Sequence, residues 1–478
     1  MSKKLLILAV AAASVLSSAA QQKNDAKSSF EEFRKGLMDN YNSFRDGILA
    51  DYAKFLDGVW VEYNGFRGQE RDNTPKPQTP PVAAPEPADT PRPVVNVVPA
   101  EPVAPEMPQP ATPAKADFPF SYHGIEMHIP SVDIRLMERA STPSDFAAQW
   151  RALDANPDAE KLVKNLQALA KNHKFNDYLT YDLATAFATA RFPGVSPSSR
   201  TSLVHYIMTH MGYDARLGAN SGGQALLMLP CKQMVYGHMY LMFDNEKYYV
   251  FADPAANLST TDTRISTCQL PKAASSAAKL DLRLQPIDIP FKAKPFTISY
   301  GGIEIKGETN ELLMPILYRY PQMPISDYAQ SELMPELRAS VVEQLRSQLS
   351  GKERREAVDQ LLQFVQSGFE YATDGENHGF EKPYFFEETL YYDKCDCEDR
   401  VIFYTYLLWN VLGVENHLIA YPGHESASVS VESSAKGDAY SYGGKTFYIS
   451  DPTYIGAKTG MCMPNYRTTS PEIDHIYK

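Results

Sequence analysis

The sequence lacks several features that would assign it to a familiar class at once. It has no cluster of lysine and arginine, and the formal net charge is −12 over 478 residues. A nucleic-acid-binding protein needs a basic face to displace counterions from phosphates, so the charge argues against a nucleic-acid partner. No apolar run approaches the roughly 20 residues of a membrane-spanning helix. P-loop, dinucleotide-binding and paired-carboxylate glycosidase patterns are also missing.

The first twenty residues have the organisation of an export signal. A short basic stretch, SKK at residues 2–4, precedes an apolar stretch at 5–16 and small residues at 17–20. This order is typical of a secretory signal peptide, which we place at residues 1–20. We therefore expect an exported protein, periplasmic or secreted. No cysteine lies near the cleavage region, so a lipid-anchored start is unsupported.

An 11-residue repeat runs from residue 30 to residue 66. In register it reads FEEFRKGLMDN, YNSFRDGILAD, YAKFLDGVWVE and YNGF. Its apolar residues recur in steps of 3, 4 and 4, which places them on one face of a helix with charges opposite. We expect an amphipathic helix over residues 21–73, lying on another part of the protein or forming a coiled coil. The second alternative predicts a homo-oligomer, because a wide aromatic stripe does not remain in water.

Most of the excess of proline lies in one segment. Residues 74–114 contain 14 of the 35 prolines. Such a segment cannot bury a core, and we expect a semi-rigid, extended linker over residues 74–116.

The remaining residues, 117–478, have a globular composition and contain a diverged duplication. SYHGIEM at 121–127 returns as SYGGIEI at 299–305, RTSLVHYI at 200–207 resembles RVIFYTYL at 400–407, and YYVFADP at 248–254 resembles TFYISDP at 446–452. Each copy is expected to contain a strand, several helices and then alternating apolar strands. The sequence thus predicts two α+β domains, at residues 117–290 and 291–478.

The second copy carries a cysteine at a predicted helix start. Cys397 follows a tyrosine-rich loop, and apolar residues then recur at helical spacing until Gly413. Unpaired backbone N–H groups at a helix start favour the thiolate, whereas Glu398 and Asp399 oppose it. A nucleophilic thiol at this position would therefore need a base.

Two residues later in the chain are candidates to complete such a site. His424 precedes a predicted half-buried strand, and Asp451 follows another strand at 445–450. Adjacent antiparallel strands can place these two side chains together, so that the carboxylate orients the imidazole and the imidazole accepts the thiol proton.

These residues resemble the transglutaminase-like superfamily. The resemblance rests on DCEDR at 396–400, His424 and DPT at 451–453, includes the helix at 357–371, and covers roughly residues 328–460. It implies a papain-like α+β core and a Cys-His-Asp triad of Cys397, His424 and Asp451, acting on amides through a thioester. The sequence departs from the pattern at Cys395, where relatives often have glycine, and after His424, where Glu425 and Ser426 replace an aromatic. Tyr392 is a candidate for the side chain that completes the oxyanion hole.

The first copy is interpreted as a degenerate version of the second. His238 and Asp253 are assigned to the positions of His424 and Asp451, and the helix start opposite Cys397 reads SPSS at 196–199, without a thiol. A serine nucleophile is the alternative. A domain without its nucleophile can still bind substrate or pack on its partner.

The five cysteines leave room for two disulfides and one free thiol. For an exported protein we expect Cys231–Cys268 and Cys395–Cys462 bridges, with Cys397 free. Zinc is the competing interpretation, with Cys395, Cys397 and either His417 or His424 as ligands. No second cysteine pair at a typical spacing accompanies them, so we expect no metal and no cofactor.

Two functions follow from the sequence. The first is an exported transglutaminase-like cysteine enzyme acting on protein or peptide amides, with hydrolysis favoured over crosslinking because water is always available outside the cell. The second is a non-catalytic binding or assembly protein of the cell envelope, in which the aromatic helix multimerises two ligand-binding modules. An intact Cys-His-Asp set in the second copy favours the enzyme.

Overall fold

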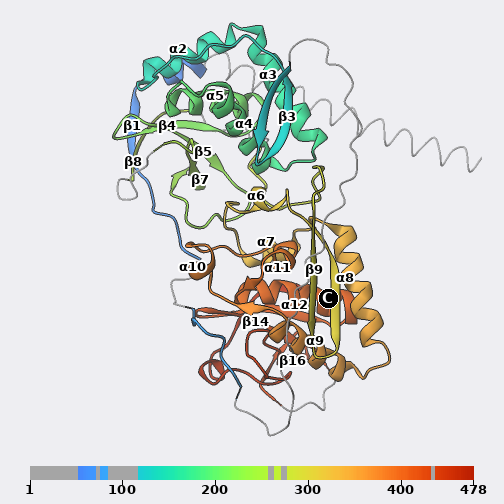
Figure 1. The fold of residues 1–478 in the computed structure, drawn as a ribbon. Helices are drawn as coiled ribbons and strands as arrows, with labels where there is room; N and C mark the ends of the chain where they lie inside the picture. The colour runs from blue at the N-terminus through green and yellow to red at the C-terminus, as the bar shows by residue number, and fades with distance from the viewer. Residues whose placement is uncertain (1–51, 72–75, 84–116, 257–262, 271–276, 432–436) are drawn as a thin grey trace, which may run out of the picture.

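The computed structural model describes residues 52–71, 76–83, 117–256, 263–270, 277–431 and 437–478. Within these residues the chain is a mixed α+β protein with two halves, the first above the second in Figure 1. The expected signal peptide, the first two copies of the 11-residue repeat and most of the expected linker lie outside the described residues. No described helix has both the length and the apolar character needed to cross a membrane.

Among the described residues the first half contains the helical residues 52–56, four further helices and eight strands. The helices are α2 (Pro143–Asp154), α3 (Pro157–Asn172), α4 (Asp177–Arg191) and α5 (Pro197–His210). The strands are β1 (Trp60–Asn64), β2 (Asp117–Tyr122), β3 (Ile125–Pro130), β4 (Arg216–Asn220), β5 (Ala225–Pro230), β6 (Tyr240–Phe243), β7 (Glu246–Phe251) and β8 (Arg264–Cys268).

The second half has more helices, and several of them are shorter than those of the first half. They are α6 (Met314–Leu317), α7 (Ile325–Gln330), α8 (Pro335–Leu349), α9 (Arg354–Gly368), α10 (Asp374–Asn377), α11 (Phe386–Tyr391), α12 (Cys397–Leu412) and the 3₁₀ turn η1 (Pro464–Tyr466). The strands are β9 (Ala293–Tyr300), β10 (Ile303–Asn310), β11 (Glu370–Tyr371), β12 (Lys394–Cys395), β13 (Asn416–Tyr421), β14 (His424–Val429), β15 (Ala439–Tyr442), β16 (Lys445–Ile449) and β17 (Glu472–Tyr477).

The main sheets of the two halves share one strand order. The first is β1-β8-β4-β5-β7-β6 and the second is β17-β13-β14-β16-β15, both antiparallel. Leaving out β1, each sheet has five strands, β4 to β8 in the first half and β13 to β17 in the second. Numbered in chain order, these strands lie side by side in the order fifth, first, second, fourth and third in both sheets. In each half a nearly all-buried helix, α5 or α12, packs on the second of these strands, β5 or β14.

A β-hairpin opens each half. Strands β2 and β3 turn at His123 and Gly124, with φ of 48° and 86°, and strands β9 and β10 turn at Gly301 and Gly302, with φ of 60° and 83°. Two consecutive positive φ angles give the turn twist that matches a right-twisted hairpin. The repeated SY-x-G-IE motif therefore corresponds to one structure used twice.

The amphipathic helix predicted over residues 21–73 is wrong in its last part. Residues 52–56 are helical, but residues 60–64 form β1, which pairs antiparallel with β8. Gly58 interrupts the helix, and the following WV-x-Y residues favour a strand when a sheet edge is available. The aromatic stripe here packs inside the first half: Tyr52 stacks on Trp150 with ring centroids 4.4 Å apart, and Trp60 stacks on Phe146 at 5.7 Å.

The start of the predicted linker is docked on the second half instead of serving as a spacer. The backbone N–H of Ala83 donates to the Ile455 carbonyl at 2.9 Å, and the Tyr371 hydroxyl donates to the Pro77 carbonyl at 2.9 Å. A proline-rich chain lacks many N–H donors but keeps all its carbonyl acceptors, so the contact uses the Pro77 carbonyl as well as the Ala83 N–H.

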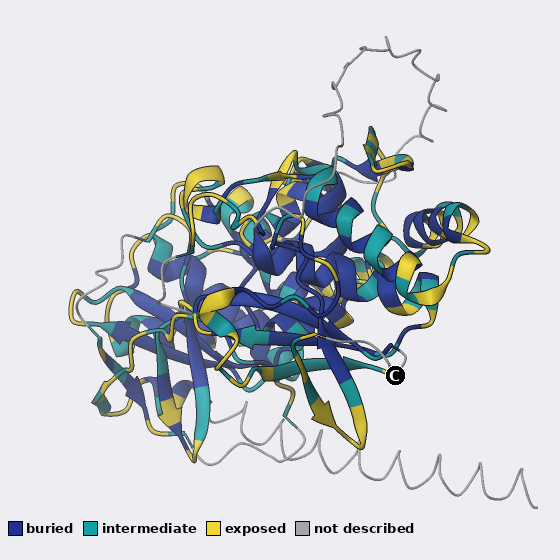
Figure 2. Cartoon of the chain, turned by 90° about the horizontal axis from the view of Figure 1, so that it is seen from below, coloured by how far each residue is buried: buried dark blue, intermediate teal, exposed yellow. Residues whose placement is uncertain are grey.

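The two halves share one hydrophobic core, with buried segments concentrated in the interior of both (Figure 2). Tyr320 from the second half packs edge-to-face on Tyr178 from the first, with ring centroids 4.8 Å apart. Its hydroxyl donates to the Leu282 carbonyl at 2.7 Å.

Neither predicted disulfide is present, because all five cysteines are free and buried. Cys268 ends β8 and Cys231 follows β5, and β4 lies between these two strands. Two strand spacings amount to about 10 Å, which exceeds the Cα separation that a disulfide spans. Cys395 faces the Glu370 carbonyl, whereas Cys462 lies by the Tyr421 hydroxyl, so the second pair is apart as well.

Candidate active site

Cys397 is the first residue of α12, as the sequence predicts. Asp396 is the N-cap, and its own N–H donates to the carboxylate of Asp399 at 3.0 Å, which closes a capping box. Gly413 ends the helix in the left-handed region, with φ of 60°. The local sequence thus fixes where the helix begins and leaves the thiol among its unpaired N–H groups.

His424 and Asp451 lie together, as the sequence also predicts. Strands β14 and β16 are antiparallel neighbours, and the His424 Nε2 lies 2.7 Å from the Asp451 Oδ2. The other carboxylate oxygen of Asp451 accepts from the backbone N–H of Thr453 at 2.8 Å. Tyr466 stacks on the His424 ring with centroids 5.5 Å apart, so both members of the pair are held in place.

The strand that begins at His424 is more buried than the sequence suggests. The alternation of apolar residues and serines predicts a half-buried strand, whereas all six residues of β14 are buried. Helix α12 packs on β14, and Ser428 is covered by the Tyr440 hydroxyl at 2.7 Å.

The Cys397 thiol is 1% exposed and does not hydrogen-bond to His424. It donates instead to the Glu398 Oε2 at 3.0 Å. Burial raises the pKa of the Cys397 thiol well above its ordinary value, and the Glu398 and Asp396 carboxylates raise it further. The structure therefore holds this cysteine as a neutral thiol.

Two cations that the sequence analysis missed lie beside the cysteine. Arg71 donates to Glu425 at 3.0 Å, to Glu381 at 2.9 Å and to Glu398 at 2.5 Å. Lys76 donates to Glu381 and Asp396, each at 2.8 Å, and also to Glu398. No signal in the sequence points to them, because more than 300 residues separate them from most of these carboxylates and they lie next to a predicted linker.

We call the surrounding carboxylates the acid pocket; its members are Asp374, Glu381, Asp396, Glu398, Asp399 and Glu425. Burial raises the pKa of Asp374 and of Glu425 to about 8 in each case, and it raises that of Asp396 well above the ordinary value. In contrast, Lys76 and Arg71 hold the pKa of Glu398 well below its usual range, against the effect of burial. Glu398 is thus the carboxylate that the two cations keep ionised.

The predicted zinc ligands do not come together. The Cys395 thiol faces the Glu370 carbonyl, and His417 bonds the Tyr440 hydroxyl at 2.7 Å while stacking on Phe447. Among the described residues, the groups close enough to share a metal ion with Cys397 are Asp396 and Glu398, and Lys76 already bonds both. Tyr392, the candidate for the oxyanion hole, packs against Tyr384 and His378 instead.

The first half has a different arrangement at the same places. Asp253 accepts from Arg200 through two hydrogen bonds of 2.7 and 2.8 Å. Pro197 is the first residue of α5, where α12 has Cys397. His238 bonds its neighbour Tyr236 at the carbonyl, at 3.2 Å, and burial lowers its pKa.

The assignment of His238 as the counterpart of His424 is wrong. His424 begins β14, the second strand of its sheet in chain order, whereas His238 precedes β6, the third strand of the first-half sheet. The corresponding first residue of β5 is Ala225. Both halves have a tyrosine shortly before Gly-His, as YGH at 236–238 and YPGH at 421–424, but the first-half copy stands one strand later, a shift that the motif alone does not reveal.

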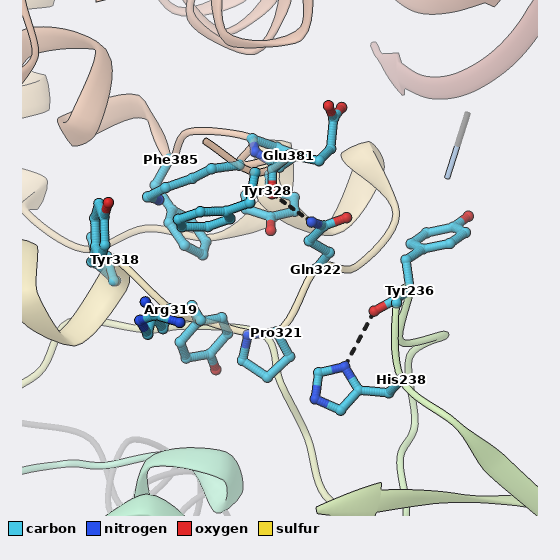
Figure 3. Close-up of a pocket in the computed structure, with 15 residues that line it drawn as sticks. Tyr236, His238, Tyr318, Arg319, Pro321, Gln322, Tyr328, Glu381 and Phe385 are labelled. Atoms are coloured by element: carbon cyan, nitrogen blue, oxygen red, sulfur yellow. Dashed lines mark hydrogen bonds between the residues drawn. The ribbon is translucent and has the colours of Figure 1, made fainter. Parts of the chain in front are cut away.

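A pocket of about 250 Å³ lies between the halves, and we call it the interhalf pocket (Figure 3). Figure 3 shows Tyr236 and His238 on one side and Tyr318, Arg319 and Phe385 on the other. Glu381 lines this pocket and also belongs to the acid pocket, so the two are adjacent.

No family model, curated protein or solved structure matches this chain.

Proposed function

We propose that the chain is an exported transglutaminase-like cysteine enzyme that acts on protein or peptide amide bonds. The observation that carries this proposal is the 2.7 Å His424–Asp451 pair on strands packed against α12, whose first residue is Cys397. The backbone N–H of Glu425, the residue after His424, lowers the pKa of the Cys397 thiol, which puts the start of β14 against the cysteine. A cysteine acyl-transfer site requires a thiol, an imidazole and a carboxylate that orients the imidazole; the second contact is present here, whereas the thiol bonds Glu398 and must turn toward His424 for the reaction.

Each group has one role in the proposed reaction. The Cys397 sulfur attacks the amide carbonyl carbon, and its proton passes to the His424 Nδ1, because Asp451 holds the Nε2. The tetrahedral oxyanion is stabilised by N–H groups at the start of α12. His424 then protonates the leaving amine, and a thioester remains on Cys397. Water attacks the thioester and releases the acid; an amine in place of water gives a transamidation product.

The finer fold assignment accompanies this proposal. We propose two tandem transglutaminase-like, papain-like domains, near residues 117–290 and 291–478, with β1 added to the first. The shared strand order and the paired hairpins support the duplication. The first domain lacks a thiol at its helix start, and its aspartate binds an arginine, which supports a non-catalytic role for it.

The competing function is a non-catalytic binding or assembly protein of the cell envelope. The observation that favours it is the cover over Cys397, where Arg71 and Lys76 bond the flanking carboxylates. Catalysis requires Arg71 and Lys76 to move away from Cys397, whereas binding without catalysis does not require this movement.

The test uses full-length protein and a tryptic peptide mixture, with and without methylamine, analysed by mass spectrometry. New termini report peptidase activity, glutamine-to-glutamate conversion reports amidase activity, and methylamides report transamidation. The proposal predicts products with the wild type or with the uncovered double variant Arg71→Ala/Lys76→Ala. These products disappear with Cys397→Ser and with His424→Ala and remain with His238→Ala. Products that survive Cys397→Ser, or no products from any protein, would favour the binding function.

Self-association is proposed for residues 21–51, since residues 52–66 already pack within the first half. Removing residues 21–51 leaves β1 intact and is expected to convert an oligomer into a monomer in light scattering. A monomer mass for each of the two proteins at tens of micromolar would refute the oligomer.

A further inference from the structure

The acid pocket binds two basic side chains of its own chain. Two guanidinium nitrogens of Arg71 and the Nζ of Lys76 donate hydrogen bonds to four carboxylates. Glu398 accepts from both cations. The Arg71 side chain is 7% exposed and that of Lys76 is 12% exposed, so these are enclosed ion pairs. Enclosed, charge-assisted pairs of this kind discriminate strongly for charge.

The pocket also has acceptor capacity that the two cations do not use. The Asp396 Oδ1 and the Glu425 Oε2 are buried without a hydrogen-bond partner among the described residues. Asp396 is fully buried and Glu425 is 8% exposed. A buried carboxyl oxygen without a hydrogen-bond partner is costly, so these two atoms point to a ligand that supplies hydrogen-bonding groups beyond those of Arg71 and Lys76.

The cations reach the pocket on an extended segment that binds both halves like a peptide ligand. Figure 1 shows this segment in blue, running from β1 in the first half to the region of α10 in the second. Phe66 pairs with Tyr240 through backbone hydrogen bonds of 2.8 and 3.1 Å, and the Gln69 carbonyl accepts from Gly237 at 2.8 Å. Beyond Lys76, the Ile455 N–H donates to the Pro81 carbonyl at 2.9 Å. Backbone hydrogen bonds with pocketed side chains are a recurring mode of peptide recognition.

Cys397 and the cations share one carboxylate. The thiol donates to the Oε2 of Glu398, and both cations bind its Oε1. A basic side chain in the acid pocket therefore lies one carboxylate away from the proposed nucleophile.

We propose that the acid pocket is the specificity subsite for a lysine or arginine side chain of a polypeptide substrate, and that Arg71 and Lys76 occupy it in cis. This inference rests on the proposed function and names the substrate class of the same site. The tethered side chains compete with substrate at a high effective concentration, so substrate binding requires their displacement.

The test measures peptide binding by fluorescence anisotropy with full-length protein. The probe is a labelled peptide, Gly-Arg-Gly-Gly-Gly-Gly-Lys-Gly, which reproduces the spacing of Arg71 and Lys76; the matched peptide carries citrulline and acetyl-lysine at these positions. Arg71→Ala/Lys76→Ala is expected to bind the cationic peptide about tenfold tighter than the wild type, and more tightly than the neutral peptide. The control is Arg67→Ala, because Arg67 is exposed and has no ion-pair partner among the described residues; it should behave as the wild type does.

A second variant keeps both cations and covers the case in which the double variant misfolds. A Cβ at Gly68 would lie 2.4 Å from the Gly237 carbonyl carbon, so Gly68→Ala should displace the segment and also expose the pocket to the peptide. Equal binding of cationic and neutral peptides by a folded variant, or no gain over the wild type in both variants, would overturn the inference.

Repeating the binding measurement with Cys397→Ser separates this inference from the proposed function. Cation-selective binding by Cys397→Ser, together with no turnover by the wild type or by Arg71→Ala/Lys76→Ala, supports the subsite and contradicts the enzyme. Turnover by Cys397 with no preference for basic peptides supports the enzyme and contradicts the subsite.

Discussion

The two halves of the molecule use the same aspartate position in different ways. Asp451 follows β16 and bonds His424, whereas Asp253 follows β7 and bonds Arg200. Arg400, the counterpart of Arg200, instead donates to the carbonyls of Gln366 and Phe369. Without a histidine at the start of the second strand, the first half uses its aspartate to neutralise a buried arginine. One fold thus supports a polar pair suited to proton transfer and an ion pair suited to stability.

The starts of α5 and α12 differ in the same sense. In the first half the Ser198 and Ser199 hydroxyls accept from the backbone N–H groups of Ala225 and Ala140, at 3.0 and 2.9 Å. In the second half Asp399 keeps such a backbone contact, to Tyr384 at 2.7 Å, but Glu398 binds Arg71 and Lys76. The two serines bond backbone N–H groups and so stabilise the fold. Glu398 instead binds two cations, Arg71 and Lys76.

The largest expected difference between the halves is the effect on peptide turnover of replacing Asp451 compared with replacing Asp253. Asp451→Asn should lower kcat by about a thousandfold with KM nearly unchanged, because Asp451 positions His424 and does not touch substrate. His424→Ala should lose about tenfold more, since the proton acceptor itself is removed. Peptide turnover measured with both variants checks the order. A loss in KM alone would show that Asp451 shapes the binding site instead.

The corresponding change in the first half should cost stability and leave chemistry intact. Asp253→Asn leaves the buried Arg200 guanidinium with a neutral amide in place of the carboxylate, beside the Val195 and Phe192 carbonyls that it also bonds; the Arg200 and Asp253 side chains are 5% and 3% exposed. Breaking such a buried pair costs about 3 kcal/mol of the free energy of unfolding. Urea unfolding of this variant and of Asp451→Asn gives the comparison. Unchanged stability in Asp253→Asn would mean that Arg200 finds another partner.

Much of this comparison was accessible from the sequence, for a physical reason. The start of α12 was predictable because caps and helical periodicity are local, and the His424–Asp451 contact followed from two neighbouring strands. The repeated SY-x-G-IE motif marked equivalent positions in the two copies, although the sequence predicted a single strand there and not a hairpin. These features depend on short-range rules that a single sequence carries.

The missed features depend on long-range contacts. Arg71 and Lys76 meet the acid pocket only after two distant segments pack, and no periodicity records such a contact. The 11-residue repeat predicted a helix through residue 66, but the edge of β8 converted residues 60–64 to a strand. His238 was assigned from a motif, and strand order places it elsewhere.

Acid should destabilise the first half through His205. This histidine is fully buried beside the Tyr52 hydroxyl at 2.8 Å, and burial lowers its pKa to about 3. Below the ordinary pKa of about 6.5 the unfolded chain binds a proton that the folded chain does not. The free energy of unfolding should therefore fall as pH decreases from about 6.5 toward 3, by up to about 1.4 kcal/mol per pH unit. Urea titrations of wild type and His205→Gln should diverge in this range; parallel pH profiles would contradict the assignment.

The second half should have the opposite pH dependence through Glu425. Burial raises the pKa of Glu425 to about 8, and Arg71 offsets only part of this effect. Between about pH 4.5 and 8 the folded chain holds a proton that the unfolded chain has lost, so stability should decrease as pH rises through this range. Glu425→Gln should flatten this slope, which for a single group is at most about 1.4 kcal/mol per pH unit, as for His205. A steeper slope in Glu425→Gln would reverse the sign argued here.

The smallest expected effect concerns the end of α12. Gly413 has φ of 60°, and a Cβ built on it would have no neighbour within 4 Å, so a side chain there meets no obstacle. The cost of Gly413→Ala is then that of the left-handed backbone alone, about 1 kcal/mol, and Gly413→Asn should recover part of it because asparagine tolerates this region. Gly68→Ala is the contrasting case, where the added Cβ would collide with the Gly237 backbone. Chemical denaturation should give the lowest stability for Gly413→Ala, a higher one for Gly413→Asn and the highest for the wild type. A loss of several kcal/mol at Gly413 would show that the αL cap supports the position of Cys397 at the other end of the helix as well.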